Sequence, residues 1–241
     1  MPVLKDVREK IENQKPGSLL TVEDFPVSQE EMGALAKALS LLYKQGALTR
    51  LAKGLYYKPA IGLLGEVPPS YGQILAKLQS LYKEKISYLT GINVYKQFGL
   101  TTQVSKEFII ASDKPRSPVK IGMTEVRFIR SHVSQAVSDI SLLQLLDAVW
   151  EIKEIPATTP NQAAQILLER FRELSPERRQ NLADLAQSYP PLTRAVVGLL
   201  FDSLGDQKLG TQLKKTLNPL TSFQLPLDGA IFPKKRNWNI L

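Results

Sequence analysis

Cysteine is absent from the 241 residues of this chain, and histidine occurs once, as His132. The first absence excludes a disulfide framework, a thiolate nucleophile and any zinc site built on cysteine. A single histidine without a second nitrogen or sulfur ligand makes a poor metal site. We therefore expect no metal ion and no cofactor in this protein.

Long apolar runs are missing as well. No stretch of about 18 apolar residues occurs, so we expect no segment that spans a membrane. Residues 1–15 are charged and lack the apolar core of a signal peptide, and the cytoplasm is the location that we expect. Neither common form of the glycine-rich phosphate loop is present, and no nucleophile motif accompanies His132. The sequence therefore favours a protein that is not an enzyme.

What the chain does contain is a modest excess of positive charge. Its 31 lysine and arginine residues against 23 acidic residues give a net charge of +8. Such a balance favours a polyanionic partner, of which nucleic acid is the commonest. The length, with 43% hydrophobic residues, exceeds the needs of one small module, and we expect a small N-terminal domain followed by a larger body.

The first 45 residues predict helices by the spacing of their apolar positions. An apolar residue recurs every four positions at Val3, Val7 and Ile11. This spacing indicates one stripe of an amphipathic helix, which ends before Pro16 and Gly17. Further on, Ser28 and Glu31 fit a capping box, and the helix that they open is predicted to end near Gln45.

The two sides of this second helix differ in chemistry. At about 100° per residue, one side is apolar and is predicted to face the core; it comprises Met32, Leu35, Leu39, Leu42 and Tyr43. The other side is polar, basic and small, and comprises Gln29, Gly33, Lys37, Ser40 and Lys44. Small residues on that side leave room for a DNA backbone, and Gln29 lies at the end of the helix where base contacts are usual.

Two short β-like runs follow, at residues 47–50 and 55–58, joined by a loop in which Gly54 tolerates a positive φ. Residues 32–65 contain five basic residues and no acidic one. Helices followed by a basic hairpin are typical of a winged helix-turn-helix, which we predict over residues 1–60 as a DNA-binding domain. The residues predicted to contact DNA are Ser28, Gln29, Lys37, Ser40, Lys44, Arg50, Lys53 and Lys58.

The rest of the chain is predicted to form the larger body, over residues 70–241, after a linker at residues 59–70. Its small α/β part extends to about residue 132, with helices at 71–82 and 91–98 and a sheet from residues 107–111, 119–122 and 124–130. Its helical part, 138–241, has a buried helix at 140–152 and others at 160–174, 176–187, 191–204 and 209–217. The predicted fold class is therefore mainly α with small β elements (α+β).

Three polar groups lie outside the predicted DNA-binding domain. Asp147, Glu151 and Glu154 share a helix face, where carboxylates can hold magnesium or transfer protons, but a solvated stripe is the favoured interpretation. For residues 101–103, inside the Gly99–Val104 stretch, we expect a turn with local side-chain hydrogen bonds. The basic tail 234–236 is expected either to contact nucleic acid or a partner protein or to be a solvated strap, with the following Trp238 packed on the body.

Three stretches together resemble a known family. They are "GALTRLAKGLYYKP" at 46–59, "GINVYKQFGLTTQV" at 91–104, and the C-terminal series "YPPLTRAVVGLL", "LNPLTSFQLP" and "NWNI". In this order they are similar to the AbiEi-like antitoxins of type IV toxin–antitoxin systems, over most of the chain. Leu41, Ala47 and Thr49 stand where that family often carries basic residues.

The resemblance implies a function that periodicity does not show. It implies a DNA-binding antitoxin that counters a nucleotidyltransferase-fold toxin. The antitoxin is expected to repress its own operon by binding double-stranded DNA at repeats in the promoter. A dimer on DNA is one arrangement that such repeats allow. The alternative is a protein–protein interaction module that neutralises this toxin directly and binds DNA weakly or without specificity. The neutral residues at positions 41 and 49 are what keep the alternative open.

Overall fold

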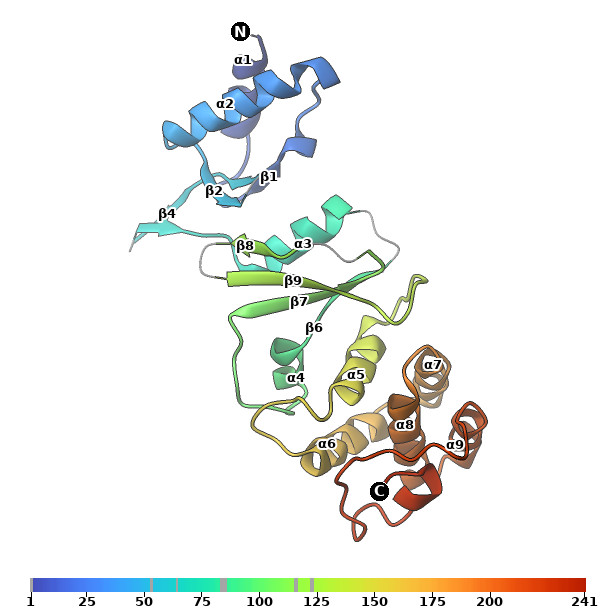
Figure 1. The fold of residues 1–241 in the computed structure, drawn as a ribbon. Coiled ribbons are helices and arrows are strands. Elements are labelled where there is room, and N and C mark those ends of the chain that lie inside the picture. The colour runs from blue at the N-terminus through green and yellow to red at the C-terminus, as the bar shows by residue number, and fades with distance from the viewer. Residues whose placement is uncertain (1, 53, 64, 83–85, 115–116, 122–123) are drawn as a thin grey trace. The chain divides into compact units, whose positions relative to one another are not determined.

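The structure is a computed structural model that describes residues 2–52, 54–63, 65–82, 86–114, 117–121 and 124–241. The chain divides into two compact units, residues 1–84 with 118–126 and residues 85–117 with 127–241. The first unit therefore continues past residue 60, where sequence reasoning ended it. Helices and small sheets build both units (Figure 1), and the predicted α+β class is confirmed.

The first unit begins with two helices that pack on each other, α1 (Pro2–Glu12) and α2 (Met32–Lys44) (Figure 1). Between them lie the short turns η1 (Val22–Asp24) and η2 (Gln29–Glu31). The predicted stripe of α1 is confirmed, because its three apolar side chains are buried. The buried face of α2 comprises Leu35, Ala38, Leu39 and Leu42.

Two residues assigned to the core face of α2 by the sequence lie elsewhere. Met32 is 42% exposed and Tyr43 is 46% exposed. At 100° per residue, both lie roughly 70–90° from the centre of the buried stripe, and the small Ala38 occupies the core position on its other side. The prediction was wrong for these two because apolar residues border the stripe and hide its true centre.

A three-stranded antiparallel sheet completes the core of the first unit, in the order β1 (Leu19–Thr21), β3 (Leu55–Tyr57), β2 (Thr49–Ala52). The strand β2 begins two residues later than predicted and shifts register between Arg50 and Ala52. Gly54 has a φ of +78°, as its place in the turn requires.

Residues 59–70 do not form the predicted linker. Two strands, β4 (Ala60–Gly62) and β5 (Gly65–Val67), pair antiparallel there, and Gly65 has a φ of +111° that other residues rarely adopt. The helix α3 (Tyr71–Tyr82) follows at its predicted bounds. Later in the chain, β8 (Val119–Ile121) pairs with the first residues of β9 (Thr124–Arg130).

The second unit contains β6 (Ser87–Thr90), which sequence reasoning missed, the predicted short helix α4 (Ile92–Gln97), and β7 (Glu107–Ser112). The strands β6 and β7 pair antiparallel, and the sheet has the order β6-β7-β9-β8. Gly99, with a φ of +81°, ends α4 as expected.

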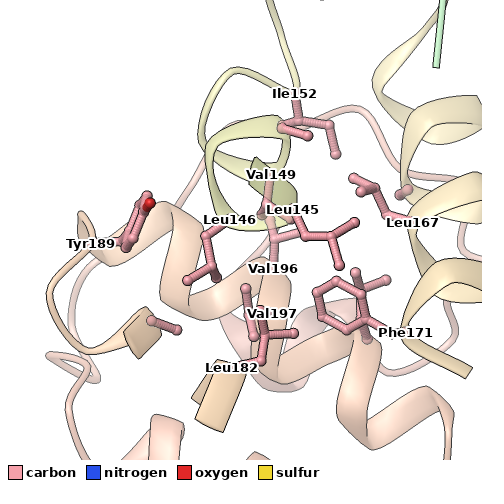
Figure 2. Close-up of a cluster of buried hydrophobic side chains, with 14 of the residues drawn as sticks. Leu145, Leu146, Val149, Ile152, Leu167, Phe171, Leu182, Tyr189, Val196 and Val197 are labelled. Atoms are coloured by element: carbon pink, nitrogen blue, oxygen red, sulfur yellow. The ribbon is translucent and has the colours of Figure 1, made fainter. Parts of the chain in front are cut away.

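Helices form the rest of the second unit. They are α5 (Ile140–Trp150), α6 (Pro160–Arg172), α7 (Pro176–Ala186), α8 (Pro191–Ser203) and α9 (Gln207–Lys214). The predicted start of α7 is confirmed, because the Ser175 hydroxyl accepts a hydrogen bond from the Arg178 N–H. Figure 2 shows α5 side chains such as Leu145 and Val149 among those of the other helices, which confirms α5 as a buried helix.

The C-terminal segment closes this core with an aromatic side chain. Trp238, in η3 (Lys235–Trp238), is 3% exposed, as predicted for a residue packed on the body. The Lys234 ammonium lies 2.8 Å from an Asp202 carboxylate oxygen of α8, and the Lys235 ammonium donates to the Leu227 carbonyl. In the described part of the chain, no helix has the length and apolar character needed to cross a membrane.

Candidate nucleic-acid interface

The solvent side of α2 is small and basic. Gly33, Lys37, Ser40 and Lys44 are all exposed and fall within an arc of about 60°, centred opposite the buried face of the helix. A Cβ atom on Gly33 would meet nothing within 4 Å. This side of α2 therefore presents two ammonium groups around small residues, with space for a second backbone to approach.

The start of this helix is fixed by Ser28 and Glu31. The backbone N–H and the hydroxyl of Ser28 each donate to the Glu31 carboxylate, at 3.0 Å. These two hydrogen bonds lower the pKa of Glu31. The predicted pairing is therefore present, although it opens the turn η2 and the α-helix proper begins at Met32. The Ser28 hydroxyl serves the helix start, whereas the neighbouring Gln29 side chain is exposed.

The hairpin residues predicted to bind DNA divide into different environments. Arg50 is exposed on β2, and its Nε donates to the Ala52 carbonyl at 3.3 Å, which holds the guanidinium along the strand. Lys53 lies outside the described residues. Of Arg50 and Lys53, the structure thus describes Arg50, and its charged group is exposed.

Lys58 makes contacts within the first unit that the sequence did not predict. Its ammonium donates to the Glu12 carbonyl at 2.7 Å and to the Gln14 carbonyl at 2.8 Å, at the C-terminal end of α1. A cation at this end of a helix satisfies carbonyls that have no partner within the helix and opposes the helix dipole. Lys58 therefore joins β3 to α1, and its contact with DNA stays a prediction.

Sequence reasoning missed Arg8. This exposed residue of α1 donates from its guanidinium to the Gln45 side-chain oxygen at 2.9 Å, immediately after α2. Arg8 therefore adds a second cation to the end of α2 that carries Lys44. The sequence places Arg8 on the polar side of α1, but nothing in its local pattern identifies a partner 37 residues away.

Charge changes sign along the first unit. Residues 1–31 contain seven acidic and four basic residues, whereas residues 32–65 contain no acidic residue and five basic ones. Two of the acidic residues, Glu30 and Glu31, precede the N-terminus of α2, where negative charge stabilises a helix. The excess of positive charge thus lies in α2 and the strands after it, whereas residues 1–31 carry an excess of negative charge.

A second polar group lies buried in the other unit, around Asp147 of α5. This carboxylate is 2% exposed and accepts hydrogen bonds from the Thr90 hydroxyl at 2.8 Å and the Tyr189 hydroxyl at 2.7 Å. Burial raises the pKa of Asp147 to about 6, although these two hydrogen bonds oppose the rise. The predicted solvated stripe is therefore wrong for Asp147, and Glu151 is only partly exposed, while Glu154 is exposed as expected.

Aromatic rings surround this carboxylate. Tyr189, whose side chain is drawn in Figure 2, has its ring centroid 4.4 Å from that of His132, which also lies edge-on to Trp150. Burial lowers the pKa of His132. The Tyr95 hydroxyl is buried without a hydrogen-bond partner in the described part of the chain, and burial raises its pKa. Asp147, Tyr95 and Tyr189 are buried in the core, whereas His132 is partly exposed and Trp150 is 37% exposed.

Two further predictions concern possible ligand sites. Within the described residues, no three His, Asp or Glu side chains are grouped as they would need to be to hold a metal ion. The turn after α4 is confirmed, because the Gln103 N–H donates to the Thr101 hydroxyl at 3.2 Å. Asn93 of α4 also bonds to the Ser105 and Glu107 carbonyls, so this stretch holds α4 against the start of β7.

The chain belongs to the DUF6088 family, a family of unknown function, whose model matches residues 6–168. Its fold is similar to that of the RV2827C protein from Mycobacterium tuberculosis, with a TM-score of 0.54 and 14% sequence identity. That likeness covers 92% of this chain and 84% of the other, and it concerns the fold alone. A comparison with curated proteins gives no match.

Proposed function

We propose that this protein is a DNA-binding antitoxin and autorepressor of a type IV toxin–antitoxin operon, and that its first unit is a winged helix-turn-helix. In this proposal η1 and α2 form the helix-turn-helix, α2 enters the major groove, and β2 and β3 form the wing. The observation that carries it is the side of α2 made of Gly33, Lys37, Ser40 and Lys44, opposite the buried face. The sheet order β1-β3-β2 beside that helix adds support.

The proposed contacts divide by the chemistry of each side chain. Gln29 and Ser40 are assigned to base edges, because an amide or a hydroxyl reads donors and acceptors in the major groove. Lys37, Lys44 and Arg50 are assigned to phosphates, where positive charge supplies most of the affinity. Ser28 positions the helix, and Arg8 is added at the end of α2.

The test is a gel-shift titration of the full chain against the DNA upstream of its gene, repeated at several salt concentrations. The Lys37→Ala/Lys44→Ala variant should bind more weakly, and the slope of log affinity against log salt should fall by about two, one for each phosphate that has no lysine partner in the variant. Lys106→Ala/Lys153→Ala removes two exposed lysines of the second unit and is the matched control. An unchanged slope in the first variant would remove α2 from the interface.

A second candidate function is direct contact with the toxin through the first unit. Exposed apolar side chains border the basic side of α2, namely Met32, Leu41 and Tyr43, which are 42%, 39% and 46% exposed. A phosphate backbone does not require such residues, whereas protein interfaces favour methionine and tyrosine. Co-expression with a neighbouring nucleotidyltransferase-type toxin separates the two candidate functions. If the first unit contacts the toxin directly, Leu41→Ser and Tyr43→Ser abolish protection against the toxin, and the native chain shows no specific DNA binding.

We assign no catalytic activity to the chain. Asp147, whose pKa is raised to about 6, is 2% exposed, and its two carboxylate oxygens accept hydrogen bonds from the Thr90 and Tyr189 hydroxyls. General acid–base chemistry requires hydrogen-bond reach to a substrate. In the proposal, the second unit contributes to neutralising the toxin through its surface rather than through a reaction.

A further inference from the structure

The charge of the helical part of the second unit changes sign along the chain. Residues 138–205 contain six basic and nine acidic residues, whereas residues 206–241 contain six basic and two acidic ones. The latter segment therefore has a net charge of +4, half of the +8 of the whole chain. Positive charge thus gathers on α9 and on the segment that follows it.

The basic residues on the two sides of this change differ in their partners. In α6 and α7, the guanidinium groups of Arg170, Arg172 and Arg178 lie within 3.2 Å of carboxylate oxygens. The cations of α9 are three exposed lysines, and in the described part of the chain none of the three forms an ion pair. The lysines of α9 therefore keep their charge available for an anionic partner.

These lysines belong to one continuous surface of α9, a helix that packs on α7 and α8 (Figure 1). Lys208, Thr211 and Lys215 fall within an arc of about 60° and line one shallow hollow. Thr211 also lines a second hollow, together with Lys214 and Asn237, so the two hollows adjoin. The residues called the α9 surface from here on are Gln207, Lys208, Thr211, Lys214, Lys215 and Asn237.

Two described carboxylates that border the α9 surface already have partners. Asp202 of α8 lies 2.8 Å from the Lys234 ammonium, and Asp184 of α7 accepts a hydrogen bond from the Gln212 side chain at 2.6 Å. Asp206 precedes α9, where negative charge stabilises the start of a helix. The lysines are therefore the groups that give the α9 surface its charge.

The composition of the α9 surface suits phosphate better than protein. Protein interfaces are depleted in lysine and enriched in aromatic residues, whereas neither α9 nor η3 has an exposed large hydrophobic side chain. Proteins bind single-stranded nucleic acid by stacking its bases on aromatic rings, and Trp238, the ring beside this surface, is 3% exposed. A duplex requires only cations and polar groups that contact its backbone, such as the Thr211 hydroxyl.

We propose that the α9 surface is a second contact of this protein with double-stranded DNA, made to phosphates and independent of base sequence. The choice of DNA over another duplex rests on the proposed function, whereas the contact with phosphate does not. In that function the first unit recognises the operator, and the α9 surface adds affinity that all DNA sequences share. Such affinity lets a protein slide along DNA before it reaches its site.

Binding of the full chain to a random-sequence DNA duplex, followed by fluorescence anisotropy at several salt concentrations, tests this contact. Lys208→Ala/Lys215→Ala should bind more weakly, and the slope of log affinity against log salt should fall by about two. Adding Lys214→Ala should lower the slope by about one more, since each lysine neutralises one phosphate. Lys106→Ala/Lys153→Ala removes two exposed lysines elsewhere in the second unit and should leave the slope unchanged.

The same measurement separates this proposal from the proposed function. In Lys37→Ala/Lys44→Ala, which lacks two of the phosphate contacts proposed for α2, the α9 substitutions should lower the slope by the same amount. If the chain does not prefer its upstream DNA but the α9 substitutions still lower the slope on the random duplex, the repressor proposal fails and this one stands.

Three results would overturn the proposal. One is an unchanged slope in the triple α9 variant, with circular dichroism showing that the variant is folded. Another is a slope that falls on an RNA duplex but not on DNA. The third is loss of protection against a co-expressed toxin with an unchanged slope on DNA, which would assign the α9 surface to an acidic protein partner.

Discussion

The two units use polar side chains in opposite ways. In the first unit, polar contacts lie near the surface and fix the ends of elements, as Lys58 does for α1 and Glu66 of β5, which accepts hydrogen bonds from the Thr49 and Tyr57 hydroxyls, does for the hairpin of β4 and β5. In the second unit, a carboxylate lies inside the core, where Asp147 meets Thr90 and Tyr189. The buried cluster of the second unit is also much the larger of the two.

This difference follows from size. A small unit buries a lower fraction of its surface, so each hydrogen bond that fixes an element end matters more to its stability. A large core supplies enough apolar burial to offset the cost of one enclosed carboxylate. The first unit is thus left with an exposed basic helix face, and the second with a rigid interior.

The largest effect is expected where α8 meets Trp238. A Cβ atom at Gly198 would overlap two atoms of the Trp238 ring, so Gly198→Ala must displace the ring. We expect a loss of about 3–5 kcal/mol, similar to that of Trp238→Ala. With Trp238→Ala already present, Gly198→Ala should be neutral or stabilise by about 1 kcal/mol, because alanine favours a helix and the obstacle is gone. Urea unfolding of the four proteins measures these values.

A helical glycine of the first unit provides the control. Gly33 of α2 has open space at its Cβ position, so Gly33→Ala should leave stability unchanged or raise it by up to about 1 kcal/mol. Additive losses from Gly198→Ala and Trp238→Ala would contradict the packing described here. If Gly33→Ala lowered the free energy of unfolding as much as Gly198→Ala, the two units would not differ in how tightly their helical glycines are packed.

A pH-dependent effect is expected at Asp147. Its folded pKa of about 6 lies above the ordinary value of 3.8 because burial, with a smaller contribution from Glu151, disfavours the charge. The folded state therefore binds more protons between these values, and the stability contribution is full below about pH 4 and lost as pH rises to about 6. The unfolding free energy of the native chain, relative to Asp147→Asn, should fall by about 2–3 kcal/mol over this range.

The exposed residue Glu154 follows α5 and gives the matched comparison. The variant Glu154→Gln removes this exposed carboxylate and is measured beside Asp147→Asn in the same urea titrations. If the stability difference between the native chain and Asp147→Asn does not change between pH 4 and 7, Asp147 is not a buried acid with a raised pKa. A fall for Asp147 alone would establish that the second unit holds a carboxylate that is neutral at mildly acidic pH.

Local patterns in the sequence were sufficient to predict local structure. The stripe of α1, the pairing of Ser28 with Glu31 and the cap at Ser175 each depend on residues three or four positions apart, which a helix brings together. The turn after α4 follows the same rule, because its Gln103–Thr101 hydrogen bond spans two positions.

Contacts between residues that are far apart in the sequence could not be predicted from it. Thr90 and Tyr189 are 57 and 42 positions from Asp147, so helix periodicity showed only the carboxylate and placed it on a solvated stripe. Lys58 was read as a DNA contact because its charge matched its neighbours, whereas its partners lie 44 and 46 positions earlier. The hairpin of β4 and β5 was taken for a linker because its strands have three residues each, too few to show an alternation.

The smallest effect is expected at Lys58, and it separates a structural cation from a DNA-binding one. Lys58→Met keeps the aliphatic stem but leaves the Glu12 and Gln14 carbonyls without their donor, which should destabilise α1 by about 1 kcal/mol. Amide hydrogen exchange in α1 should accelerate about fivefold in the full chain. The salt slope of DNA binding should not change, whereas Lys44→Ala should lower it by about one. A lower slope for Lys58→Met with unchanged exchange would return Lys58 to the DNA interface and weaken the argument that the first unit depends on its surface contacts.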